Sequence, residues 1–297
     1  MGSHPGEVNG ACSAGGGSAK AAHMASRYSG PRGKPGATRE QIERRERFER
    51  ARRESLRPAG DGPVVMYGWH TVTAALRNPA RRLRKLLATE NAARRLAEEG
   101  ITLPLKPELV RPTAIAERLP PDAVHQGLYL EADPLPAPAV GALPAQGIVL
   151  VLDQITDPHN VGAIFRSAAA FAATAIITTQ RHSPEATGAL GKAASGALEF
   201  VPLVSVQNLA RGLSALKQNG FLVVGLDSSG DSDLAALPLR APLALVLGAE
   251  GKGLRQLTRE TCDAVARIDL PGAITSLNVS NAAALALYIA SRRLAAP

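Results

Sequence analysis

The stretch LVLDQITDPHNVGAIFRSAAAF, from Leu150 to Phe171, joins a predicted strand to a predicted helix. Its first residues form an apolar run that is typical of a buried strand, and a compact polar turn follows. The helix after the turn is almost entirely alanine and other apolar residues, apart from Arg166 and Ser167. An arginine in a helix suited to burial indicates either an anion-binding residue or half of an ion pair. This stretch alone leaves both open.

Short aliphatic runs of the same kind recur from Gly147 onward, separated by helical segments. Such runs are typical of parallel strands that helices cover on both faces. We therefore predict an α/β domain with a parallel sheet over residues 148–297. Its strands are expected within residues 148–155, 173–179, 220–227, 243–250 and 265–271.

A smaller α/β unit is predicted upstream, over residues 64–135. From Val64 the sequence reads as strand, helix, strand and helix, and Pro79 ends the first of these helices. Residues 136–147 are rich in Pro, Ala and Gly, which is typical of a linker.

Residues 1–63 are predicted to form a basic N-terminal arm. Up to about Arg39 the arm is rich in Gly, Ser, Ala and Pro without apolar periodicity, so we expect disorder there. AAHM at Ala21–Met24 resembles a cloning junction. Arginine and glutamate then alternate from Glu40 to Arg57, which indicates a solvated helix, an arm that orders on RNA, or a charged tail.

The composition narrows the class of protein. The chain has 297 residues, of which 45% are hydrophobic, so it can bury a sizeable core. We see neither a run long enough to cross a bilayer nor a secretory signal. Cys12 and Cys262 lie far apart, and the six histidines show no ligand spacing, so we expect no disulfide framework and no metal. This use of cysteine is consistent with a reducing compartment. We expect a bacterial cytoplasm by default, and a mitochondrial location stays open.

The chain is strongly basic, with a formal charge of +8. This balance indicates either an anionic partner, most often nucleic acid, or a solvated arginine-rich surface. Because aromatic residues make up only 3% of the chain, an RNA partner would be held more by phosphate contacts and shape than by base stacking. A basic cluster in the smaller unit could track RNA phosphates or form a solvated face. Its members are Arg77, Arg81, Arg82, Arg84 and Lys85.

Three loops follow predicted strands at their carboxyl ends, the edge at which open α/β sheets bind ligands. The first contains Asn160 as a plausible helix N-cap, with Gly162 and Arg166 four residues apart on one helix face, so that the glycine leaves space beside the arginine. The second, LVLGAEGKGL, is neither a P-loop nor a G-x-G-x-x-G turn, and Glu250 lies among its glycines without a packing purpose.

The third loop is polar and precedes an alanine-rich helix near the C-terminus. Ser280 or Asn281 is the expected N-cap of that helix. Capping does not explain Ser276 and Asn278, which lie just upstream. These two side chains are therefore candidate site residues.

Together the three loops resemble the three motifs of the SpoU (TrmH-type) RNA ribose 2′-O-methyltransferases, a branch of the SPOUT superfamily. The resemblance covers residues 148–293. Residues 67–92 and 125–136 are similar to the L30e-like substrate-binding domain of the 23S rRNA guanosine methyltransferase subgroup. The matching motif residues are Asn160, Gly162 and Arg166; Gly248, Glu250, Gly251 and Gly253; and Leu270, Pro271, Ser276, Leu277, Asn278, Val279 and Ser280.

The resemblance implies a deep trefoil knot in the C-terminal domain, a homodimer, and S-adenosylmethionine as the cofactor, with no membrane association. It also implies that a bent cofactor presses against the glycines of the second loop. The implied catalytic residues are Arg166, Asn160, Glu250, Ser276 and Asn278. The implied cofactor-binding residues are Leu247, Gly248, Gly251, Ile268, Leu270 and Leu277.

The implied activity is methylation of a ribose 2′-hydroxyl, in a guanosine of 23S rRNA. Methylation of tRNA and a non-catalytic RNA-binding paralogue are the alternatives. The absence of G-x-G-x-x-G after the first strand of the large domain disfavours a nucleotide-dependent oxidoreductase. His159 has a suitable pKa for a base, but the family pattern leaves its position unspecified. Arg166 could orient the ribose or act as the base, and positioning is favoured because arginine rarely loses its proton.

Overall fold

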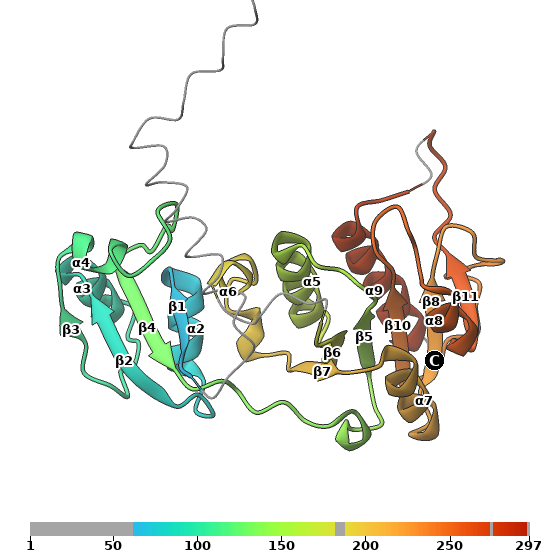
Figure 1. Ribbon diagram of the computed structural model, residues 1–297, viewed down its shortest axis with the longest axis horizontal. Helices are drawn as coiled ribbons and strands as arrows, with labels where there is room; N and C mark the ends of the chain where they lie inside the picture. Colours follow the sequence, from blue (N-terminus) through green and yellow to red (C-terminus); the bar gives the residue numbers. More distant parts are fainter. Residues whose placement is uncertain (1–61, 182–187, 274–275, 296–297) are drawn as a thin grey trace, which may run out of the picture. The chain divides into compact units, whose positions relative to one another are not determined.

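The computed structural model describes residues 62–181, 188–273 and 276–295 (Figure 1). The predicted N-terminal arm, including the charged segment from Glu40 to Arg57, lies outside the described residues. Of the helices in the described part, none combines the length and apolar character needed to cross a bilayer.

The smaller unit is built on a four-stranded sheet in the order β1-β4-β2-β3. Strand β4 runs antiparallel to both of its neighbours, whereas β2 and β3 are parallel. The strand–helix–strand–helix pattern predicted from Val64 is present, and the first helix ends before Pro79. The elements are β1 (Val64–Tyr67), α2 (Trp69–Arg77), β2 (Leu83–Ala88), α3 (Glu90–Glu98), β3 (Glu108–Leu109), α4 (Pro112–Ala116) and β4 (Leu128–Ala132).

The larger unit contains a seven-stranded sheet in the order β7-β6-β5-β10-β8-β11-β9, and every neighbouring pair is parallel. The predicted parallel sheet is therefore confirmed. Four of the five predicted strand segments contain one of these strands, and the fifth, residues 265–271, overlaps β11, which begins one residue earlier. The strands are β5 (Ile148–Leu152), β6 (Ala175–Thr179), β7 (Leu203–Val206), β8 (Leu222–Leu226), β9 (Ser232–Asp233), β10 (Leu243–Leu247) and β11 (Ala264–Arg267).

Helices cover both faces of the large sheet, which explains why β5 is apolar at every position. Leu150 and Leu152 pack into the core that includes α5 and α9. Val149 and Val151 point to the opposite core, which includes α7. The helices are α5 (Pro158–Ala170), α6 (Gly188–Ala193), α7 (Leu209–Gln218), α8 (Gln256–Thr261) and α9 (Val279–Ala295), with short 3₁₀ turns η1 (Val140–Ala142) and η2 (Ala197–Glu199).

The sheet order brings the three predicted loops to one edge. Strands β5 and β10 are neighbours in register, with Leu152 opposite Leu247 at their carboxyl ends. Strand β11 is separated from β10 only by β8. Helices α5 and α9, which follow the first and third loops, contact each other directly (Figure 1).

Candidate active site

The carboxylate of Glu250 joins the three loops. Its Oε1 accepts hydrogen bonds from Nδ2 of Asn278 at 2.8 Å, from Nδ2 of Asn160 at 3.2 Å and from the backbone N–H of Val279 at 3.3 Å. Asn278 also donates to Oδ1 of Asn160 at 3.0 Å. Residues 28 to 118 positions apart in the chain thus form one polar cluster at the carboxyl edge of the sheet.

The structure corrects the expected N-cap of α5. The helix begins at Pro158, and the side chain of Asp157 caps it by accepting from the N–H of His159 at 3.1 Å. Asn160 therefore lies inside the first turn, too late in the chain to cap. Its amide is consequently available to Glu250.

The expected N-cap of α9 is corrected in the same way. The helix begins at Val279, so Ser280 and Asn281 already lie within it. Oδ1 of Asn278 accepts from the N–H of Ser280 at 2.9 Å and from its hydroxyl at 2.6 Å. The side-chain oxygen of Asn278 thus accepts hydrogen bonds from the start of α9, and its side-chain nitrogen donates to Glu250.

Arg166 is exposed on α5, the helix that also carries Asn160. Among the described residues, no acidic group pairs with its guanidinium and no acceptor lies within hydrogen-bond distance. Of the two interpretations that the sequence left open, this favours anion binding over a structural ion pair.

Gly162 has a different role from the one expected. It is buried, and a Cβ there would lie 2.3 Å from the Cβ of Ala193. The glycine allows α5 and α6 to pack closely, rather than leaving space beside Arg166.

The second loop folds back on itself. The N–H of Gly253 donates to the carbonyl of Ala249 at 2.9 Å, and a Cβ on Gly248 would lie 2.2 Å from the carbonyl carbon of Gly253. Gly253 has a φ of +63°, and its Cβ would meet Oδ2 of Asp227 at 2.6 Å. The loop's own fold therefore requires these two glycines, independently of any cofactor.

Two carboxylates anchor this loop, and sequence reasoning missed both of them. Asp153 follows β5 and is fully buried; it accepts from Nε of Arg255 at 2.7 Å and from its backbone N–H at 3.1 Å. Asp227 follows β8. Although burial acts to raise its pKa, hydrogen bonds from Ser229 and Leu254 and the charge of Arg259 keep that pKa below the usual value. The signal in the sequence that could have identified Asp153 and Asp227 is an acidic residue directly after an apolar strand.

Similarity to known proteins identifies the family of this chain. Residues 147–288 match the model of the SpoU rRNA Methylase family. The 23S rRNA (guanosine-2′-O-)-methyltransferase RlmB of Pseudomonas putida is 37% identical over 77% of this chain and 96% of that protein. The protein of the same name from Pseudomonas aeruginosa is 38% identical over 75% of this chain and 94% of its own length.

The chain belongs to the SpoU methylase family.

A solved SpoU structure supports the same assignment. The SpoU methyltransferase AviRb from Streptomyces viridochromogenes, solved in complex with the cofactor AdoMet, superposes with a TM-score of 0.67 at 25% identity. The match covers 78% of this chain and 90% of that one. The resemblance inferred from the three motifs is confirmed, and SpoU methylases use S-adenosylmethionine as the methyl donor.

The residues expected to bind this cofactor lie in the loops after β10 and β11 and just before α9. Leu247 ends β10, and Leu277 is partly exposed. Among the described residues, the backbone N–H groups of Glu250, Gly251 and Ile268 have no hydrogen-bond acceptor. Gly251 has open space where a side chain would lie. These residues fit a SpoU cofactor that is held largely through backbone groups. The remaining residues of the expected cofactor-binding set are Gly248 and Leu270.

Ser276 is exposed and makes no hydrogen bond to the described residues. It lies two positions before Asn278, at the start of the segment that leads into α9. Its proposed part in the SpoU site therefore rests on its position in the motif rather than on an observed contact.

The basic cluster of the smaller unit is not uniformly available to RNA. Arg81, with only 6% of its side chain exposed, pairs with Glu199, from Nη2 to Oε1 at 2.5 Å and from Nε to Oε2 at 3.1 Å. Its Nη1 donates to the carbonyl of Asp133 at 2.9 Å. All three guanidinium nitrogens are thus engaged, so this structure corrects the expectation that Arg81 holds a phosphate.

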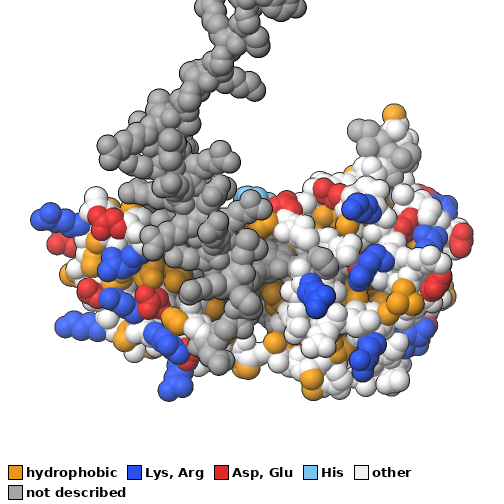
Figure 2. Space-filling view, in the orientation of Figure 1, with side chains coloured by type: hydrophobic (Ala, Val, Ile, Leu, Met, Phe, Trp, Pro, Cys, Tyr) orange, Lys and Arg blue, Asp and Glu red, His pale blue; other side chains and the backbone are white. Residues whose placement is uncertain are grey.

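The other four members of the cluster are more accessible. Arg77 and Arg82 are exposed, and Arg82 lies 3.9 Å from the carboxylate of Asp133. Arg84 pairs with Asp133, and Lys85 pairs with Glu108 at 3.2 Å. On the face shown in Figure 2, Lys and Arg side chains stand beside acidic ones rather than forming one continuous patch.

Replacing Glu250 with glutamine is expected to lower kcat/KM by about 10- to 100-fold with little change in Tm. Glutamine keeps an acceptor oxygen but loses the charge, so each hydrogen bond from Asn160 and Asn278 falls from about 1.5–3 kcal/mol to about 0.5–1.5 kcal/mol. The site is exposed, so water can also hydrate these amides in the folded protein. Methyl-transfer kinetics and thermal denaturation measure the two effects. Glu260→Gln, an exposed glutamate on α8, is the matched control. Normal kcat/KM in the Glu250 variant would show that the cluster does not support catalysis.

Proposed function

We propose that this SpoU methylase transfers a methyl group from S-adenosylmethionine to the ribose 2′-hydroxyl of a guanosine in 23S rRNA. The observation that carries the proposal is the Glu250 cluster, which brings the three motif loops together at the carboxyl edge of the sheet. The nucleotide and the RNA are supported by the names of the relatives, which this chain matches over nearly their whole length.

The chemistry requires positioning more than activation. The cofactor supplies a methyl group that is already activated as a sulfonium, so the protein mainly has to align the ribose oxygen and assist loss of its proton. Arg166 offers a fixed positive charge and a planar fork for the ribose and its phosphate. Its guanidinium does not deprotonate readily, so we assign it positioning and charge stabilisation. Glu250 then fixes Asn160 and Asn278 at the mouth of the site.

Two alternative functions are less well supported than this one. A tRNA substrate is disfavoured by the relatives, which carry an rRNA name over most of this chain. A non-catalytic paralogue is disfavoured because Asn160, Arg166, Glu250 and Asn278 are all present, and three of them contact one another.

Methyl transfer from labelled cofactor to purified 23S rRNA and to tRNA tests the proposal. We expect label in 23S rRNA at one guanosine, and mapping of the 2′-O-methyl position identifies it. Label in tRNA alone would replace the substrate with the first alternative. RNA binding without any transfer would favour the paralogue.

Finer features of the family are also proposed for this chain. These are the trefoil knot, the L30e-like nature of the smaller unit, the linker over residues 136–147, the cytoplasmic location and the homodimer. Exposed apolar side chains in the described part support the homodimer, among them Leu277 before α9 and Tyr288 on it. Light scattering on the purified chain measures the oligomeric state.

Exchanging both Arg77 and Arg82 for glutamate is expected to weaken RNA binding by tenfold or more at low salt. For each phosphate that the protein no longer neutralises, the slope of log K against log salt should also become shallower by roughly 0.7–0.9. Fluorescence anisotropy at several salt concentrations measures both quantities.

Arg81→Ala is the contrasting variant in that experiment. It breaks a buried pair with Glu199, which costs on the order of 3–5 kcal/mol of stability, so Tm should fall while the salt slope stays unchanged. Unchanged affinity and slope in the Arg77/Arg82 variant would instead indicate a solvated basic face.

A further inference from the structure

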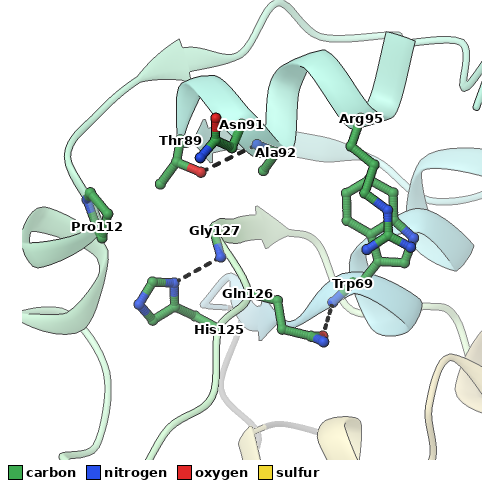
Figure 3. Close-up of a pocket in the computed structure, with 9 residues that line it drawn as sticks. All are labelled: Trp69, Thr89, Asn91, Ala92, Arg95, Pro112, His125, Gln126 and Gly127. Carbon is green, nitrogen blue, oxygen red and sulfur yellow. Dashed lines mark hydrogen bonds between the residues drawn. The ribbon is translucent and has the colours of Figure 1, made fainter. Parts of the chain in front are cut away.

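A pocket of about 300 Å³ lies in the smaller unit, outside the Glu250 cluster (Figure 3). It is formed by the first residues of α2 and α4, the start of α3 and the loop before β4. Its volume is at the lower end of the range for small-molecule sites. That suits a single nucleoside.

The loop on one side of the pocket is held in an unusual conformation. Gln126 has a φ of +50°, which a residue with a side chain rarely adopts, and Gly127 follows at +80°. Oε1 of Gln126 accepts from the backbone N–H of Trp69 at 2.8 Å, which pins the loop to α2. Gly127 lies so close to α3 that a Cβ would meet Oγ1 of Thr89 at 2.4 Å. A strained conformation held from two sides is characteristic of binding sites.

The polar groups around the pocket are mainly donors. Nδ1 of His125 accepts from the N–H of Gly127 at 3.1 Å, and burial lowers the pKa of His125, so the neutral ring carries its proton on Nε2. Oδ1 of Asn91 accepts from Arg94, which leaves its NH₂ group as the available donor. The lining contains no aspartate or glutamate among the described residues. A ligand rich in acceptor atoms therefore suits the pocket.

One wall of the pocket is a flat stacked pair. The guanidinium carbon of Arg95 lies 3.8 Å from the centroid of the Trp69 ring, and Figure 3 shows the two groups stacked. Trp69 is only 4% exposed, so its ring supports the guanidinium of Arg95 from the inner side of the pair. The side chain of Arg95 is half exposed and held by a 2.9 Å hydrogen bond to Glu99. Arginine planes of this kind stack on unpaired bases in RNA recognition.

We propose that this pocket binds one unpaired nucleotide of the RNA substrate. Its base stacks on the outer face of Arg95, and its acceptor atoms face Nε2 of His125 and the amide of Asn91. The proposal rests on the RNA substrate of the proposed function. A paired base cannot enter, because its edge and faces are covered in the duplex, so the pocket selects a loop or bulge.

Binding of the full chain to three probes tests the proposal: a labelled RNA hairpin with an unpaired loop, a fully paired duplex of similar length, and free guanosine monophosphate. Asn91→Ala and Arg95→Gln are compared with Arg118→Gln, an exposed arginine of the same unit outside the pocket lining. We expect the Kd for the hairpin to rise about tenfold in both pocket variants, and to stay unchanged for the duplex and in the control. Trp69 is the only tryptophan of the chain, so its emission reports occupancy directly.

The outcomes separate this proposal from the proposed function. Pocket variants are expected to raise KM for RNA and to leave kcat and cofactor binding unchanged. Equal hairpin affinity in the pocket variants and the control would overturn the pocket assignment while methyl transfer still stood. Tight binding of free guanosine monophosphate without hairpin preference would overturn it in favour of a mononucleotide site. A wild-type chain that binds hairpins through the pocket but transfers no methyl group would sink the proposed function alone. Asn91 is exposed, so its variant stays informative even if Arg95→Gln lowers Tm.

Discussion

Replacing Arg166 with alanine is expected to reduce methyl transfer to background, a decrease on the order of 10³-fold in kcat, while S-adenosylmethionine still binds. The side chain is exposed and has no partner among the described residues, so its removal leaves no buried group unpaired. Stability should change by no more than about 0.5 kcal/mol. Removal of one preorganised charge aimed at a reacting group typically costs about 10²–10³ in kcat, and poorer ribose alignment adds to this. Single-turnover kinetics and calorimetric titration of the cofactor measure the two effects.

Two further variants sharpen the assignment of Arg166. Arg211→Ala removes an exposed arginine from α7, on the opposite face of the sheet, and should leave kcat unchanged. Arg166→Lys keeps the charge but not the planar fork, so we expect partial activity that is flat with pH. A rate that climbs toward the usual lysine pKa of about 10.4 would indicate a base instead. Near-normal turnover in Arg166→Ala would remove this residue from the mechanism.

Gly248→Ala is expected to abolish cofactor binding. The added Cβ would lie 2.2 Å from the carbonyl carbon and 2.3 Å from the carbonyl oxygen of Gly253. Both are backbone atoms that a rotamer change cannot move, so the loop after β10 has to refold. Overpacking of this kind costs about 1–3 kcal/mol and displaces the N–H groups of Glu250 and Gly251, which have no acceptor in the described part of the chain. Calorimetric titration with S-adenosylmethionine measures the decrease in affinity.

Gly272→Ala provides the matched control for that experiment. A Cβ at Gly272 meets nothing within 4 Å, and its φ lies outside the left-handed region. The same chemical change should therefore leave cofactor affinity within about twofold. Normal cofactor binding by Gly248→Ala would mean that the loop tolerates the refolding and that its tight turn is not required.

The strands of the large sheet were predictable because burial on both faces leaves a direct trace in the sequence. Ile148–Leu152 and Leu243–Leu247 are apolar at every position, and both lie in the centre of the sheet. Strands β7 and β9 were not predicted. They form the two edges, and Ser205, Ser232 and Asp233 interrupt the apolar pattern there.

The sequence identified the residues of the site but not their contacts. Asn160 had a plausible local explanation as a helix N-cap, whereas capping left Asn278 unexplained. Their hydrogen bonds to Glu250 span 90 and 28 positions. Asp153 and Asp227 lay inside segments that were predicted as strands, so their polar role after the last strand residue was missed. Local pattern does not reveal which distant group a polar side chain will meet.

By itself, the sequence determined the parallel sheet, the three loops at its carboxyl edge and the family. Aliphatic runs and motif spacing are properties of neighbouring residues, and burial acts on them locally. Only the tertiary structure decided the use of particular side chains. It showed that Arg81 pairs with Glu199, 118 positions away, so that Arg81 is no longer a candidate RNA-binding residue. It also showed that Gly162 serves helix packing, because the atoms that its Cβ would meet belong to Ala193 and Ala194 of another segment.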